Sequence, residues 1–360
     1  MNSIYQEEKQ KLLDSNYNKY MNKTLKELQK DYSKAQKDIE SEIAKWYARM
    51  DDIKKTTPEF RFSELKHLED LQKQIKLILD ELAVVEETLL TETLKELYVS
   101  DFVDLHKLNE KYGLLELNTP SPQFNQLPKI QVLETYISMP NITATTKELA
   151  KLVDLELVGD AISGKWFSTR IMERAEKLNY SIENKIRQAI IRGDSYSKTA
   201  SVVAKDLKTS YKSVKTLVRT EMSIAENKSV THNAMKLGFN GLKWSTYHDD
   251  TVCKICREMD GTIFPVEQIK SQDLIAHPNC RCTLVEVVLD ENGKEVKSQF
   301  RDEAEEYLKK KATERKQEAE RIRNMHVEQE EPKLEPKDKS QTKKRTKKKT
   351  KNGTEIKIDV

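Results

Sequence analysis

The sequence predicts a mainly α-helical protein with one small antiparallel β element, an α+β fold. No glycine occurs before Gly113 and no proline before Pro58. A chain that avoids both helix breakers for so long favours long helices. Segments rich in β-branched and aromatic residues appear only after residue 240, which places the strands late in the chain. With 34% charged and 37% hydrophobic residues, the composition favours long solvated helices over one large core.

We expect residues 1–112 to form a long helical hairpin or arm. From Leu25 to Met50, apolar residues recur every three or four positions, close to the a/d pattern of coiled coils. Pro58 interrupts this run, and a second apolar stripe extends from Leu65 to Leu82. The two helices should therefore pack antiparallel. They serve either as a structural hairpin or as an arm that docks onto a larger assembly.

The next segments divide into a linker and a second domain. Residues 113–145 contain four prolines and few charges, which predicts a linker or extended strap. Helical patterns resume at Thr146, continue through 166–191, and restart after Arg192-Gly193-Asp194-Ser195 in a long helix that ends near Gly238. We expect one domain over 146–290. Within it, residues 243–290 form a β block from the short strands 242–247, 262–266 and 282–288, with a turn at Asp260-Gly261.

The C-terminal part of the sequence is strongly charged. Residues 291–330 predict a charged helix, and residues 331–360 a disordered, lysine-rich tail. Between positions 337 and 351 there are nine basic residues and one acidic residue, so of the net +3 this stretch carries +8 and the rest −5 (3 − 8). Such a tail suits contact with DNA phosphates. The candidate contacts are Lys343, Lys344, Arg345, Lys347, Lys348 and Lys349.

No apolar stretch approaches the roughly 20 residues needed to span a bilayer, so we expect no membrane partner. The first residues lack the apolar core of a signal peptide. The protein should therefore be made in the cytosol, where thiols stay reduced. Clustered cysteines in that compartment favour a metal site over disulfides.

All four cysteines fall within thirty residues, as Cys253-x-x-Cys256 and Cys280-x-Cys282, and His277 precedes the second pair. A structural zinc ion needs four such ligands, commonly as two pairs on separate turns. His277-x-x-Cys280 has the usual spacing of a second pair. Cys282 is an alternative ligand, because residues two apart on a strand share a face. The sequence therefore predicts a structural zinc site drawn from these five residues.

Several other interpretations of this block stay open. Cys280 and Cys282 suit a small apolar core, and disulfides would form if the protein reached an oxidising environment. A nucleophilic cysteine with His248 or His277 as its base is a further alternative. A catalytic zinc is disfavoured because no H-E-x-x-H helix is present. The run from His248 to Asp250 is more typical of a turn cap than of a cation site.

One acidic residue lies on an apolar helical stripe. Val214, Val218, Glu221 and Ala225 share one face of the long helix. A buried carboxylate needs a partner, and we expect Arg281 to supply it, with Arg219 as the local alternative. The result would be a structural ion pair that ties the helix to the β block.

Two family resemblances follow from these residues. The series L-V-R-T-E at 217–221, W-S-T-Y-H-D-D-T-V-C-K-I-C at 244–256, D-G-T-I-F-P at 260–265 and H-P-N-C-R-C-T-L at 277–284 resembles the Mu F-like phage head-morphogenesis (minor head protein) family, over about residues 150–290. Separately, Arg219-Thr220-Glu221 and Ser245-Thr246 resemble the Arg, Ser-Thr and Glu positions of ADP-ribosyltransferases. That family's final E-x-E element is missing.

The first resemblance implies a non-enzymatic minor structural protein of a tailed-phage head. It implies association with the portal protein and other head or scaffold proteins, and a role in head morphogenesis and in DNA packaging or delivery. The protein would lie in the virion, in the head interior or at the portal vertex, and in the host cytoplasm during assembly. The alternatives are a nucleic-acid-binding zinc module and a cysteine-dependent hydrolase or transferase. The eight acidic residues within 243–290 make the β block a poor surface for DNA.

Overall fold

The structure, a computed structural model, describes residues 3–56, 62–117, 120–139, 143–159, 165–246, 252–270 and 273–295. It confirms the predicted fold class: helices dominate, and one small antiparallel sheet follows them in the described part of the chain. The longer helices are α1 (Ser3–Thr56), α2 (Phe62–Lys111), α4 (Pro128–Ile137), α7 (Phe167–Arg192) and α8 (Tyr196–Lys236). The short helices are α3 (Leu114–Leu117), η1 (Phe124–Gln126), α5 (Thr146–Leu149), η2 (Ala150–Leu152), α6 (Leu155–Val158), α9 (Lys254–Met259) and η3 (Val266–Gln268). The strands are β1 (Gly241–Ser245), β2 (Ile263–Pro265) and β3 (Thr283–Val287).

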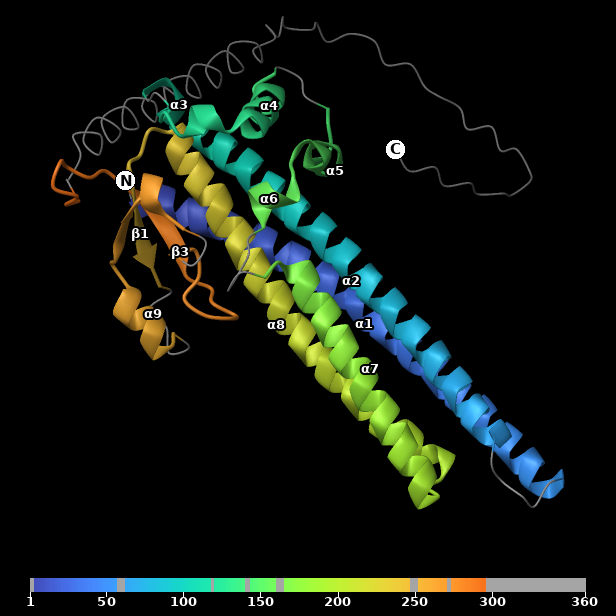
Figure 1. Ribbon diagram of the computed structural model, residues 1–360. Helices are drawn as coiled ribbons and strands as arrows, with labels where there is room; N and C mark the ends of the chain where they lie inside the picture. Colours follow the sequence, from blue (N-terminus) through green and yellow to red (C-terminus); the bar gives the residue numbers. More distant parts are fainter. Residues whose placement is uncertain are drawn as a thin grey trace, which may run out of the picture. The chain divides into compact units, whose positions relative to one another are not determined.

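The helices α1 and α2 form the predicted antiparallel hairpin (Figure 1). Their register is visible in two buried hydroxyl pairs, Tyr20 with Ser100 and Thr24 with Thr93, each at 2.8 Å. Every member of the α1 stripe from Leu28 to Met50 is buried. The 3.6-residue period of the sequence therefore specifies this pairing. Pro58, the expected break, lies outside the described residues.

The helices α7 and α8 form a second hairpin that packs against the first (Figure 1). Gly193 ends α7 with a left-handed conformation at φ 68°, which a glycine adopts without steric cost. Ser195 then caps α8 by accepting a hydrogen bond from the Lys198 amide. Helix α8 contacts α1, α2 and α7 and also β3, so it connects the bundle to the β block.

Two separate hydrophobic cores result. The bundle core runs along α1, α2, α7 and α8, and its fully buried members include Ile39, Ile43, Ile75, Leu94, Ile182 and Val203. The end core joins the ends of the helices to the β block. It consists of Tyr5, Leu13, Leu105, Leu108, Tyr112, Leu114, Ile224, Val230, Ala234, Leu237, Phe239, Leu242, Trp244, Cys256, Val266, Leu274, Ile275, Cys280, Cys282 and Leu284.

The β block is a three-stranded antiparallel sheet in the order β2-β1-β3. Leu242 on the central strand pairs with Phe264 on one side and with Glu286 on the other. The predicted strands thus form close to their expected positions. Gly261, at φ 79°, makes the predicted turn before β2.

The segment predicted as a linker, 113–145, contains helical structure. Pro128 is the first residue of α4, a position where its missing N–H and fixed φ favour a helix. Ile130 and Leu133 of α4 are fully buried in the bundle core. Thr145, one residue before the predicted restart of the helical pattern, caps α5 in a capping box with Glu148.

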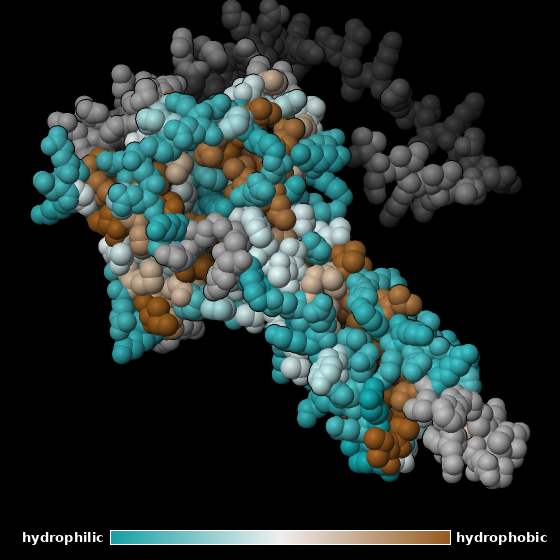
Figure 2. Space-filling model, in the orientation of Figure 1, coloured by the Kyte–Doolittle hydropathy of each residue, from teal (hydrophilic) through white to brown (hydrophobic). Residues whose placement is uncertain are grey.

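All described residues belong to one compact unit. Within them, no helix combines the length and the apolar character that crossing a membrane requires. Figure 2 shows a mostly hydrophilic face with separate hydrophobic patches, one of them at the tip of the α7–α8 hairpin, where Ile191 is exposed. The domain boundaries stay predictions. The basic tail and most of the charged segment 291–330 lie outside the described residues.

Candidate metal centre

Cys253 and Cys256 lie at the start of α9. Cys253 is the residue before the helix, and the amide of Cys256 donates a hydrogen bond to its sulfur at 3.4 Å. One helical turn therefore brings both sulfurs to the same side of the chain. Cys256 is 3% exposed, whereas Cys253 is half-buried.

His277 and Cys280 lie on a tight turn before β3. The Cys280 amide donates to the His277 carbonyl at 3.0 Å, and Asn279 has a left-handed φ of 64°. Asparagine tolerates this conformation better than most residues. The turn directs Cys280 into the end core, and Cys282 follows at the entry to β3.

The five predicted ligands lie together in two overlapping triads that share Cys256. The first triad is Cys253, Cys256 and His277, and the second is Cys256, Cys280 and Cys282. The Nε2 atom of His277 lies 3.2 Å from each sulfur of the first pair. The sulfurs of Cys256 and Cys280 are 3.7 Å apart. All four cysteines are free thiols, and the cluster could hold a metal ion.

The imidazole of His277 is oriented by a backbone carbonyl. Its Nδ1 atom lies 2.7 Å from the carbonyl oxygen of Pro278. A carbonyl only accepts hydrogen bonds, so Nδ1 carries the proton. In the neutral ring, Nε2 is then the unprotonated nitrogen, and it faces the sulfurs. Metal-binding histidines are typically held in this way by their second nitrogen.

The environment gives the thiols very different acidities. Hydrogen bonding from the Cys282 thiol, together with backbone amides, lowers the pKa of Cys280 to about 5. Burial raises the pKa of Cys256 to about 12. The hydrogen bond to Cys280 also raises the pKa of Cys282. The cluster therefore contains a thiolate at neutral pH, the form that binds metals.

Helix α8 holds the turn through its side chains. The Ser223 hydroxyl donates to the carbonyl of Cys280 at 2.7 Å. The Asn227 amide donates to the carbonyl of Cys282 at 3.1 Å and to that of Leu274 at 2.7 Å. Sequence reasoning missed these residues. Their signal is a set of small polar residues at helical spacing in an otherwise buried stretch of α8.

The ion pair between α8 and the β block involves a different carboxylate from the one expected. Glu221 is fully buried but pairs with Arg170 of α7. The carboxylate that pairs with Arg281 is Glu226, at 3.5 Å. The other expected partner, Arg219, has an exposed side chain. The spacing along α8 predicted that Glu221 is buried, and a buried carboxylate needs a charged partner. The spacing did not show on which neighbouring helix that partner lies.

Arg281 also contacts α1. Its guanidinium lies 3.0 Å from the Asp14 carboxylate and 3.5 Å from the centre of the Tyr17 ring. Nearby, Lys9 of α1 pairs with Glu286 of β3 at 2.5 Å, and both side chains are buried. Two ion pairs therefore connect the start of α1 to the β block.

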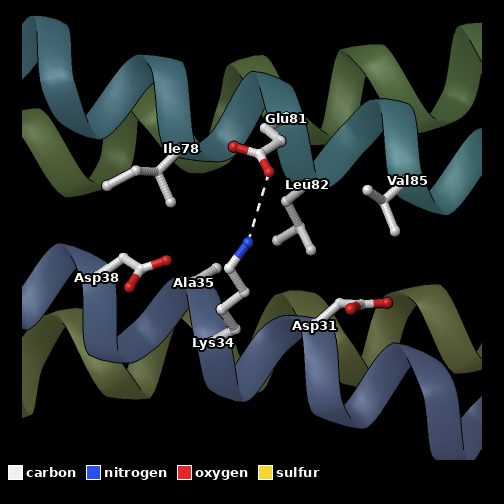
Figure 3. Close-up of a pocket in the computed structure, with 8 residues that line it drawn as sticks. All are labelled: Asp31, Lys34, Ala35, Asp38, Ile78, Glu81, Leu82 and Val85. Carbon is white, nitrogen blue, oxygen red and sulfur yellow. Dashed lines mark ion pairs between the residues drawn. The ribbon is translucent and has the colours of Figure 1, made fainter.

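The remaining candidates are not part of this cluster. The run 248–250 and the candidate DNA contacts at 343–349 lie outside the described residues. A separate groove lies between α1 and α2 (Figure 3). Lys34 and Glu81 face each other across it at 3.6 Å, over a floor that includes Ile78 and Leu82. The described residues that line it include no cysteine or histidine.

Part of this chain, including the cysteine and histidine cluster, matches a known protein family. Residues 180–285 match the family described as "Phage Mu protein F like protein". This segment is Mu F-like. It contains the end of α7, all of α8 and the whole cysteine and histidine cluster, and it lies within the predicted span of about 150–290. The family suggests a phage head-related protein, which fits a location in the virion and contact with other phage head proteins.

A curated relative has an enzyme's name. The chain is 23% identical over 288 residues to "NAD(+)--arginine ADP-ribosyltransferase EFV" from Enterococcus faecalis (strain ATCC 700802 / V583). The match covers 69% of this chain and 55% of that protein, so the chain spans about half the length of this relative. No solved structure matches the chain.

Proposed function

We propose that this protein is a non-enzymatic minor structural component of a tailed-phage head, associated with the portal. One observation supports this most directly. In the Mu F-like segment the polar side chains of α8 bind neighbouring parts of the same chain: Ser223 and Asn227 hold the cysteine turn, and Glu226 pairs with Arg281. Such a site is built for rigidity, and a rigid core with long helices suits an assembly protein.

Co-purification tests the portal partner. The full chain, co-expressed with the portal protein of the same phage, should purify as a complex. The matched control is the scaffold or capsid protein of the same phage, which tests whether any head protein is retained. Recovery of the scaffold or capsid protein with no retained portal would contradict portal association. A phage lacking the gene should assemble defective heads, and normal infectious heads would overturn the proposed role.

The basic tail offers a contact for packaged DNA, in the head interior or at the portal vertex. Its +8 charge predicts duplex binding that weakens steeply with salt. The full chain and a version that ends at Pro332 should therefore differ in duplex affinity at low salt. Equal affinities would exclude the tail as the contact. If the zinc module itself bound DNA, the version that ends at Pro332 would instead keep the full duplex affinity.

The enzyme name of the relative motivates a direct test of the alternative. Buried Glu221 is paired with Arg170, which suits a structural role. We expect the full chain to consume no NAD⁺ above the rate of a heat-treated sample, with or without an arginine-containing acceptor. Transfer of ADP-ribose by the folded protein would overturn the non-enzymatic proposal.

A further inference from the structure

We propose that Cys253, Cys256, His277 and Cys280 bind one Zn²⁺ ion, and that this ion fixes the turn through which Arg281 fastens helix α1 to the β block. The inference does not depend on a role in a phage head. It follows from the ligand geometry and from the position of Arg281 between two cysteines.

The ligand set suits zinc. Thiolate sulfur and imidazole nitrogen are its usual ligands, with Zn–S bonds of about 2.3 Å, which in a tetrahedron place two sulfurs about 3.8 Å apart. Cys256 and Cys280 already lie at 3.7 Å. The orientation of His277 by the Pro278 carbonyl presents Nε2 to the sulfurs. Folding has thus brought Cys253, Cys256 and His277 together, with Cys280 beside Cys256, before any ion binds.

The structure favours Cys280 over Cys282 as the fourth ligand. Cys280 lies on the same tight turn as His277. A single ion bound to both residues would therefore join this turn to the turn of Cys253 and Cys256 at the start of α9. Cys282 lies next to Cys256 and Cys280, but it comes after that turn, at the entry to β3. Neither its sulfur nor that of Cys280 belongs to the triad with His277, so the assignment rests on the shared turn. We therefore assign Cys282 as a neighbouring thiol that donates a hydrogen bond to Cys280.

The same turn carries the contact with α1. Arg281 follows Cys280 directly and lies against Asp14 and Tyr17 of α1. It also pairs with Glu226, which is 2% exposed. Displacing Arg281 would leave a buried carboxylate without this partner, which is costly. Loss of the ion should therefore loosen the first turns of α1, although they are more than 230 residues from the ligands in sequence.

The test begins with the metal content of the full chain. Protein purified with zinc present should contain about one zinc per chain by elemental analysis, and cobalt substitution should give the intense visible bands of a tetrahedral thiolate site. Cys280→Ser should lose the metal, whereas its matched control Cys282→Ser should keep it. Absence of both zinc and cobalt binding would overturn the site. Retention by Cys280→Ser with loss by Cys282→Ser would overturn the ligand assignment.

Hydrogen exchange tests the connection to α1. Chelation of the wild-type protein should raise amide exchange in residues 5–17 by about tenfold or more, and added zinc should restore protection. This reversible step avoids variants that fail to fold. Arg281→Ala should keep the zinc yet show the same faster exchange in 5–17. Unchanged exchange after zinc removal would overturn the connection even if the metal site is real.

Discussion

The bundle core and the end core are built on different principles. The bundle core joins stripes that recur every three or four residues along α1, α2, α7 and α8. The end core gathers short pieces that are far apart in the sequence, such as Tyr5, Leu105 and Leu284. Periodic apolar packing dominates the first, which also contains buried ion pairs between its helices, such as Arg170 with Glu221. The second adds ion pairs between α1 and the β block and a cysteine cluster. Helix length and apolar period thus specify most of the bundle core, whereas the small end core depends more on directional contacts between distant segments.

The largest expected effect comes from breaking a buried ion pair of the end core. Lys9→Met leaves Glu286, whose side chain is fully buried, without its charged partner. Such a change should cost about 3–5 kcal/mol of unfolding free energy, measured by urea denaturation. The double variant Lys9→Met/Glu286→Leu should recover most of the loss. A cost below about 1 kcal/mol for the single variant would show that apolar packing, not the ion pair, holds α1 there.

Acid should weaken the region where the two cores meet. His232 bonds to Tyr98 of the bundle core and lies between two residues of the end core, Val230 and Ala234. Burial, and secondarily the charge of Lys228, lowers the pKa of His232 to about 3. The fold holds a neutral imidazole, whereas the unfolded chain binds a proton below about pH 6.5.

The stability from this group is therefore present above pH 6.5 and falls as the pH drops toward 3, by about 3 kcal/mol at pH 4. Denaturation at pH 7 and pH 4 measures the change. His232→Gln keeps an acceptor for Tyr98 and should show a smaller difference between the two pH values. An unchanged difference would assign the acid sensitivity to other groups.

Matched truncations compare the apolar packing of the two cores. Ile43 of the bundle core and Ile224 of the end core are both fully buried. Replacing either by valine should cost about 1 kcal/mol, measured by thermal or urea unfolding. Similar losses of unfolding free energy in the two variants would mean that the cores differ in their polar contacts and not in their apolar packing. A much smaller cost for Ile224→Val would indicate a loosely packed end core.

The smallest effect is expected at the exposed ion pair over the groove. Lys34 and Glu81 have side chains 68% and 69% exposed, so water and salt screen their attraction. Lys34→Ala should change stability by less than about 0.5 kcal/mol, in contrast to Lys9→Met. A loss above about 2 kcal/mol would mean that this groove contributes more than its exposure suggests.

Much of the bundle could be predicted because its signals are local. The spacing from Leu28 to Met50 encodes the buried stripe of α1, and Gly193 marks the end of α7. The region around Pro128 was misread because proline breaks a helix interior but begins a helix at its first position. The spacing of Ile130 and Leu133 was the available sign of a packed helix there.

The contacts of the end core could be predicted only in part. Sequence spacing predicted that the five candidate cysteine and histidine ligands form one cluster, since each pair lies on its own local turn. It did not place Asp14 beside Arg281 or Arg170 beside Glu221. Ion pairs between distant segments leave no local sequence pattern, because any arginine in the chain has the charge required to pair with a given carboxylate.

The pairing of Lys9 with Glu286 has a consequence for synthesis. These residues are 277 positions apart, so at about 5–20 residues per second the ribosome needs roughly 14–55 s to supply the partner. During that interval Lys9 lacks its charged partner on β3, although α2 already supplies Asn109 and Tyr112 as contacts of Tyr5. Of the described helices α1 is made before the others, but the contacts at its start are complete only when β3 has been made. This start is where we expect chaperones to bind the nascent chain.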